Sequence, residues 1–116
     1  MRVQSEVLDG VAILRLIGRF VTGSDAELSA AEKSLQEAGI SNAILDLSAV
    51  PYVDSTGLAF IVELHKSLAA REGQLFLAGA GPRVREVLEM TRIAEIVPMF
   101  ENVADAEAAL DSEVLC

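Results

Sequence analysis

Short apolar runs alternate with helical patterns along most of this chain, and this alternation limits the possible folds more than any other feature. The run from Ala43 to Leu47 is compact and apolar, which is typical of a strand buried in the centre of a sheet. A helix is expected from about Leu58 to Arg71, a further strand from Gln74 to Ala78, and another helix that starts at Pro82. Strands that alternate with helices predict a mostly parallel sheet.

The first third of the chain adds a hairpin and a helix to this pattern. Asp9-Gly10 is a strong turn signal between two short strands, Val3 to Leu8 and Val11 to Ile17. Helix-start residues follow from Gly23, and Leu28, Ala31, Leu35 and Ala38 then recur at helical spacing up to Gly39. A hairpin joined to parallel strands makes the expected sheet a mixed one.

The chain should end with one more strand and one more helix. Ile96 to Phe100 predicts a short edge strand, because Pro98 cannot donate a hydrogen bond to a neighbouring strand. Ala106, Ala109 and Leu110 mark a closing helix. We therefore expect a small α/β fold in a single domain, residues 1–116, with a mixed β-sheet and helices packed mainly on one face.

The composition excludes several classes of protein. Of the 116 residues 52% are hydrophobic, so the chain can bury a core. A net charge of −9 repels phosphate backbones and anionic lipid, so we expect no binding to nucleic acid. Cys116 is the only cysteine and His65 the only histidine, which leaves neither an internal disulfide nor a zinc site.

The sequence also indicates a compartment. The N-terminal residues lack the apolar region of a signal peptide, and no apolar run reaches the length of a membrane span. We therefore expect a cytoplasmic protein with no direct membrane insertion. No pattern in the sequence points to a bound cofactor.

Two possible catalytic or nucleotide-binding patterns are incomplete. Gly79-Ala80-Gly81 resembles the start of a dinucleotide-binding loop, but Val84 stands where the third glycine is needed. Ser55 and His65 would lie ten positions apart on one helix, about 15 Å at a rise of ~1.5 Å per residue. That separation prevents the hydrogen bond that nucleophilic catalysis needs.

Asp54-Ser55-Thr56-Gly57 allows two interpretations. The first is a helix cap, because Asp, Ser and Thr side chains accept hydrogen bonds from the free N–H groups at a helix start. The second is a phosphorylation site, because a helix N-terminus favours an anion and could carry a phosphate without unfolding. The residue pattern by itself is compatible with both.

The stretch from Ile44 to Leu58 resembles the signature of STAS domains, and most closely that of stand-alone anti-sigma factor antagonists. That signature is a hydrophobic strand with an internal Asp or Asn, a short link, and then Asp-Ser-Ser/Thr-Gly-Leu. The similarity continues through Gly73-Gln74-Leu75, Pro82-Arg83-Val84 and Ala108-Ala109-Leu110, so it covers nearly the whole chain.

The resemblance implies a bacterial regulatory function without enzymatic activity. An unphosphorylated antagonist binds an anti-sigma factor, often itself a serine kinase, and so releases a sigma factor for transcription. The kinase then phosphorylates the serine directly after the Asp, here Ser55, and a serine phosphatase reverses the modification. Asp54, Thr56, Gly57 and Leu58 would surround this site and contribute to partner binding.

One position departs from the family pattern. The family places Gly-Glu-Leu-Asp at the end of its second strand, whereas this chain has Gly18-Arg19-Phe20-Val21. Val21 therefore replaces an acidic residue that commonly lies beside the phosphorylation site. Loss of a group that orients the hydroxyl predicts slow phosphorylation of Ser55.

Two other functions remain open for such a domain. It could be the STAS subunit of another assembly, such as a lipid-transport or stressosome-like complex, in which Ser55 and Thr56 only cap a docking helix. It could also sense a small ligand or a nucleotide, although no phosphate-binding loop supports this function.

Overall fold

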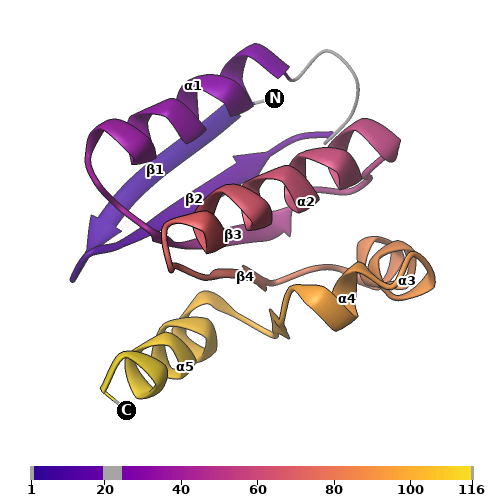
Figure 1. Ribbon diagram of the computed structural model, residues 1–116. Coiled ribbons are helices and arrows are strands. Elements are labelled where there is room, and N and C mark those ends of the chain that lie inside the picture. Colours follow the sequence, from indigo (N-terminus) through magenta and orange to yellow (C-terminus); the bar gives the residue numbers. More distant parts are fainter. Residues whose placement is uncertain (1, 20–24, 116) are drawn as a thin grey trace.

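A five-stranded mixed sheet organises the chain, as the alternation of strands and helices predicted (Figure 1). The computed structural model describes residues 2–19 and 25–115. The strands lie in the order in which they occur in the sequence: β1 Arg2–Leu8, β2 Val11–Ile17, β3 Asn42–Ala49, β4 Leu75–Ala78 and β5 Met99–Phe100. β1 and β2 are antiparallel, and every later pair of neighbours is parallel.

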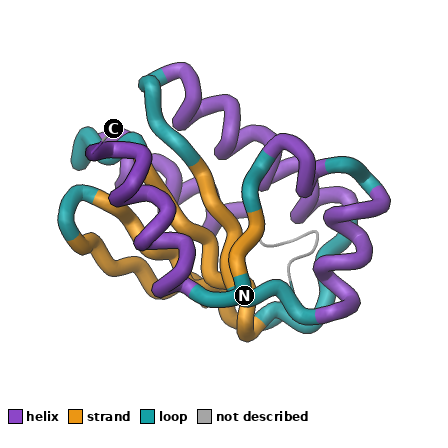
Figure 2. Tube along the Cα trace, turned by 90° about the horizontal axis from the view of Figure 1, so that it is seen from below, coloured by secondary structure: helices purple, strands orange, loops and turns teal. Residues whose placement is uncertain are grey.

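Four helices cover one face of this sheet and a fifth lies on the other. The first four are α1 Asp25–Glu37, α2 Ser55–Ala70, α3 Pro82–Met90 and α4 Ile93–Ile96, and their buried residues join one cluster. The fifth, α5 Val103–Leu115, packs on the opposite face, on β3, β4 and β5. In the view from below, the helix near the C-terminus lies in front of the strands (Figure 2). The expected α/β fold with helices mainly on one face is confirmed.

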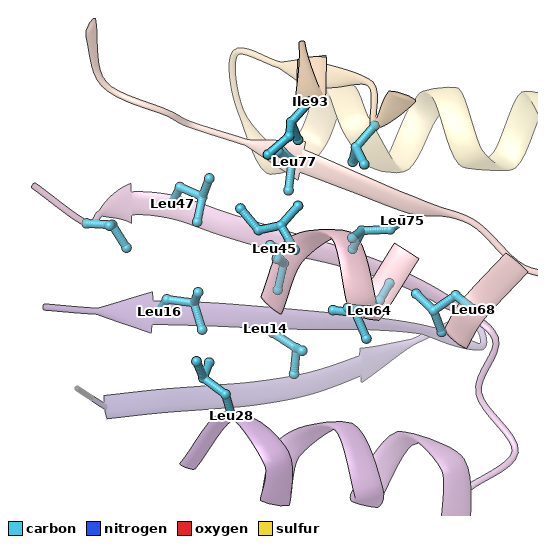
Figure 3. Close-up of a cluster of buried hydrophobic side chains, with 14 of the residues drawn as sticks. Leu14, Leu16, Leu28, Leu45, Leu47, Leu64, Leu68, Leu75, Leu77 and Ile93 are labelled. Carbon is cyan, nitrogen blue, oxygen red and sulfur yellow. The ribbon is translucent and has the colours of Figure 1, made fainter. Parts of the chain in front are cut away.

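The main core is made of aliphatic side chains between the sheet and the first four helices. Alternate residues of β2 and β3, such as Leu14 and Leu45, point into it and meet Leu64 and Leu68 of α2 (Figure 3). All four are at most 1% exposed. Ile44 points the other way and packs with Phe76 beneath α5, so β3 is buried on both faces, as its continuous apolar run predicted.

The N-terminal hairpin has the turn that its sequence predicted. Asp9 and Gly10 both have positive φ angles, 51° and 79°. Two successive residues with positive φ are characteristic of the type I′ turn, which matches the twist of the strands on either side. Leu8 and Val11 face each other directly across the turn, and the pairing continues to Arg2 and Ile17.

Two boundaries differ by three residues from the sequence expectation. Helix α2 starts at Ser55 rather than Leu58, because Asp54 caps it one turn earlier than the apolar pattern indicates. The last strand is only Met99–Phe100, since Ile96 belongs to the short helix α4 and the Val97 N–H bonds back to the Ile93 carbonyl at 2.9 Å. The Pro98 carbonyl still accepts a hydrogen bond from Leu77 N at 2.9 Å.

A tight contact joins the loop after α2 to the start of β3. A Cβ atom on Gly73 would lie 1.6 Å from the backbone oxygen of Ser41, so only glycine fits here. Next to it, Gln74 N donates to the Asn42 side chain at 3.0 Å and Ala43 N donates to the Gln74 carbonyl at 2.9 Å. These bonds align β3 and β4 and so fix where α2 lies on the sheet.

Candidate functional site

The start of α2 is held by the side chain of Asp54. Its backbone is extended, with φ −107° and ψ −172°, and its Oδ1 accepts hydrogen bonds from Thr56 N at 2.9 Å and Gly57 N at 3.1 Å. Its carbonyl oxygen also accepts from Leu58 N at 3.0 Å. The aspartate therefore satisfies two of the N–H groups that a helix start leaves free, and the cap interpretation is correct for this residue.

Ser55 follows the cap as the first residue of α2, and it is exposed. Gly57 is buried, and Thr56 and Leu58 are half-buried, so the helix turns these neighbours toward the protein while Ser55 faces solvent. Since the carboxylate of Asp54 makes the cap, the cap does not depend on the Ser55 hydroxyl. The structure thus places the acceptor candidate where a second protein can reach it.

The Asp54 carboxylate already partly neutralises the positive end of the α2 dipole. An anion next to a helix N-terminus is stabilised by the helix dipole. The Asp54 carboxylate occupies that position and uses the N–H groups of Thr56 and Gly57. A phosphate on Ser55 would meet the favourable dipole and also this neighbouring negative charge, so its net effect on the fold should be small.

A cation and an aromatic ring meet where the chain leaves β2 and β3. The guanidinium carbon of Arg19, just after β2, lies 5.7 Å from the centre of the Tyr52 ring, a cation–π contact between two exposed side chains. Gly18 N donates to the Ala49 carbonyl at 3.1 Å, which ties the end of β2 to the end of β3. Sequence reasoning did not identify this pair, because it joins residues that are distant in the chain.

A cleft opens between the loops that follow β3 and β4. It has a volume of about 500 Å³ and is lined by residues 48–51 on one side and 81–84 on the other. Arg83 lies in its wall, in the first turn of α3. The carboxyl ends of parallel strands meet at one edge of a sheet, which is why this cleft and the Ser55 loop adjoin each other.

The structure separates the other residues that the sequence singled out. His65 lines a different cavity, together with Gly73 and Pro98, and does not share the cleft beside the Ser55 loop. Gly81 caps α3 with Pro82 in its first turn, as expected for a turn followed by a helix. Val21 lies outside the described residues. Within residues 2–19 and 25–115, no helix is long and apolar enough to cross a membrane.

The family model of the STAS domain matches residues 2–106. The chain belongs to the STAS family. It is 33% identical to BtrV of Bordetella bronchiseptica, provisionally described as an anti-sigma factor antagonist, over 94% of both chains. This STAS protein therefore belongs with the anti-sigma factor antagonists, which are regulatory proteins rather than enzymes.

Three further similarities define the breadth of the family. An anti-sigma factor antagonist from Mycobacterium paratuberculosis superposes with a TM-score of 0.85 at 23% identity, over 95% of this chain and 93% of that one. The Bacillus protein SpoIIAA in its phosphorylated form gives a TM-score of 0.73 at 19% identity, over 93% and 98%. High affinity sulfate transporter 1 of Stylosanthes hamata is 40% identical over 72 residues, 60% of this chain but 11% of the transporter.

Proposed function

We propose that this STAS protein binds an anti-sigma factor in its unphosphorylated form and is switched off by phosphorylation of Ser55. The observation that carries the proposal is that the helix cap and the exposed hydroxyl at the start of α2 belong to different residues. Asp54 makes the cap, and the adjacent Ser55 is left exposed at the helix N-terminus. A hydroxyl without a role in the cap can accept a phosphate without a loss of structure.

Two relatives support the proposal. BtrV, similar over nearly its full length, is provisionally described as an anti-sigma factor antagonist. SpoIIAA, which shares the fold, exists in a phosphorylated form. The proposed partners are accordingly an anti-sigma factor that is itself a serine kinase, and a serine phosphatase that restores the free hydroxyl. We place the exchange in the cytoplasm, where sigma factors act.

The physical basis of the switch is a charge introduced into a protein–protein interface. Phosphorylation adds about −1.5 to −2 charges. On the free protein the dipole favours the phosphate by ~0.3–1 kcal/mol, partly offset by Asp54. A charge desolvated or repelled in an interface can cost ~2–5 kcal/mol, and each ~1.4 kcal/mol is a tenfold change in affinity. The partner complex should therefore weaken far more than the fold.

The expected contact surface lies around the start of α2. The exposed Ser55 forms its centre, with the half-buried Asp54, Thr56 and Leu58 and the buried Gly57 around it. The exposed ring of Tyr52, 40% accessible, lies just before them in the chain. An exposed aromatic side chain next to a positive charge is a common anchor in protein interfaces. Arg19 supplies that charge at 5.7 Å from the ring centre.

The test is a pull-down from native lysate, with wild-type protein, Ser55→Asp and Ser29→Asp as baits, and identification of the captured proteins by mass spectrometry. Ser29 is also an exposed serine in a helix, so its variant controls for the added charge. We expect wild type and Ser29→Asp to capture an ATP-binding anti-sigma factor, and Ser55→Asp to lose it. Equal capture by all three baits would contradict the proposed switch.

The match to a sulfate transporter favours one alternative, a STAS module that works within a larger assembly. In that case Ser55 would be part of a docking surface that is never phosphorylated. The same pull-down separates the two functions, because a membrane transport protein captured equally by wild type and Ser55→Asp would support the alternative.

A further inference from the structure

Strand β1 forms an open edge of the sheet. It pairs with β2 on its inner side, and no strand of residues 2–19 or 25–115 lies on its outer side. Every residue of β1 except the half-buried Val3 is exposed, including Val7 at 53% and Leu8 at 45%. β1 also lacks the proline, lysine and bulge with which proteins commonly protect such an edge, so it can pair with another strand.

The hairpin determines which backbone groups of β1 are available. In a turn of two residues, the flanking pair Leu8 and Val11 is hydrogen-bonded, and hydrogen-bonded pairs then alternate along the ladder. The backbone groups of Arg2, Gln4, Glu6 and Leu8 therefore face β2. Those of Val3, Ser5 and Val7 point outward and can bond to an added strand.

We propose that two copies of this chain associate by antiparallel pairing of their β1 strands about a two-fold axis at Gln4. In this register Arg2 of each copy lies opposite Glu6 of the other, and Val3 exchanges backbone hydrogen bonds with Ser5. Two β1 strands that run in opposite directions therefore place opposite charges against each other at both ends of the pairing. Opposite charges that face each other across an antiparallel pair stabilise it, whereas like charges destabilise it.

The charged pairs would lie on the side of the sheet away from α1. Side chains alternate along a strand, and Val3 packs in the cluster beneath α1 and α2. The Cβ atoms of Arg2, Gln4 and Glu6 therefore point to the opposite side. Gln4 and Glu6 line a cavity there, and Arg2, at the start of the strand, also borders the groove beside α1. The main contacts of α5 are with β3, β4 and β5, and the cavity, of about 510 Å³, lies between Gln4 and Glu6 on β1 and Val103 and Glu107 on α5, which leaves room for these side chains to meet.

Helix α1 is compatible with a second copy beside it. A groove of about 370 Å³ lies between β1 and α1, lined on the helix by Glu27, Ala30, Ala31 and Ser34. The two-fold axis would bring α1 of both copies together on one face of the joined sheet. Ala30, Ala31 and Ser34 have small side chains that permit a close approach, and the Ser34 hydroxyl already donates to the Ala30 carbonyl at 3.0 Å.

The proposed dimer does not compete with the proposed switch. β1 is separated by β2 from β3, the strand that leads to the Ser55 loop. Both copies of that loop would remain accessible, so each dimer could bind two partner molecules. The dimer can therefore be tested independently of phosphorylation, and failure of one proposal does not affect the other.

Disulfide trapping tests the register, in a Cys116→Ser background with any purification tag at the C-terminus. In the proposed register, Gln4 lies directly opposite Gln4 of the second copy, and facing Cα atoms at about 4.5–5.5 Å are within disulfide range. Ser5 is its matched control, exposed and adjacent, but diagonal to its own copy at about 7–8 Å. Oxidation should link Gln4→Cys into dimers and leave Ser5→Cys largely monomeric.

Sedimentation equilibrium of the unlinked native chain provides the second measurement. We expect a dimer whose dissociation constant rises roughly tenfold or more in Arg2→Glu, and returns toward the native value in Arg2→Glu/Glu6→Arg. Thermal melts verify that each variant is folded. A native chain that is monomeric at the highest attainable concentration would overturn the proposal, as would trapping through Ser5→Cys in preference to Gln4→Cys.

Discussion

The roles of Asp54 and Ser55 can be separated by their effects on stability. Asp54 Oδ1 accepts two backbone hydrogen bonds, from Thr56 N at 2.9 Å and Gly57 N at 3.1 Å. Replacing an N-cap residue by alanine costs about 0.5–2 kcal/mol, and two short bonds in a half-buried position favour the upper part of this range. For Asp54→Ala we therefore expect a loss of about 1–2 kcal/mol.

Two companion variants isolate the cause of that loss. Asp54→Asn keeps an oxygen in the same place, and Asn is as good an N-cap as Asp, so its stability should stay within about 0.5 kcal/mol of wild type. Ser55→Ala removes an exposed hydroxyl that the cap does not use, and should also change stability by less than about 0.5 kcal/mol.

Thermal unfolding followed by circular dichroism, together with urea titration, gives the required precision. At roughly 4 °C per kcal/mol for a chain of this size, Asp54→Ala should melt about 4–8 °C below wild type. The other two variants should melt within about 2 °C of it. If Ser55→Ala loses as much stability as Asp54→Ala, Ser55 is a structural cap, and the reasoning that makes it a free acceptor is wrong.

Three further predictions follow, two from the structure and one, at Val21, from the sequence. Phosphorylation by the cognate kinase should modify Ser55 and not Thr56. It should weaken partner binding at least tenfold and move the melting temperature by less than about 2 °C, and calorimetry on both forms measures the affinity and the melting temperature. Val21→Asp should speed that phosphorylation, by up to ~10²-fold in single-turnover kinetics, and an equal or slower rate would contradict the orienting role. Gly73→Ala should cost at least ~1–3 kcal/mol in urea unfolding, because its Cβ would overlap Ser41, while Gly81→Ala, where a Cβ would meet no atom within 4 Å, should cost less.

The sequence predicted those parts of the fold that depend on local signals. Asp9-Gly10 indicates the hairpin because two adjacent residues must adopt positive φ, and Gly81-Pro82 indicates the start of α3 because proline suits a first helical turn. The apolar run of β3 indicates burial on both faces. Each of these signals acts within a few residues of its own position.

The parts that the sequence did not predict depend on contacts between distant residues or on competing local geometry. Ile96 has the apolar character of a strand residue, but Arg92 adopts a left-handed conformation, φ 65°, that starts α4 instead. Whether Asp54 or Ser55 makes the cap is decided by hydrogen-bond geometry that several cap residues in a row leave ambiguous. The contact of Arg19 with Tyr52 requires the ends of two strands to be brought together first.

Because α5 is the only described helix on its face of the sheet, we expect the helices on the two faces to separate from the sheet at different free energies. Among the described residues, 20 buried side chains form the cluster under α1–α4, whereas seven form the one under α5, two of them Ala106 and Leu110 of the helix itself. A segment held by few buried contacts separates at a lower free energy than the whole protein unfolds. We therefore expect helix α5 to detach before the whole protein unfolds, uncovering Ile44 and Phe76 while the main core and the capped start of α2 stay intact.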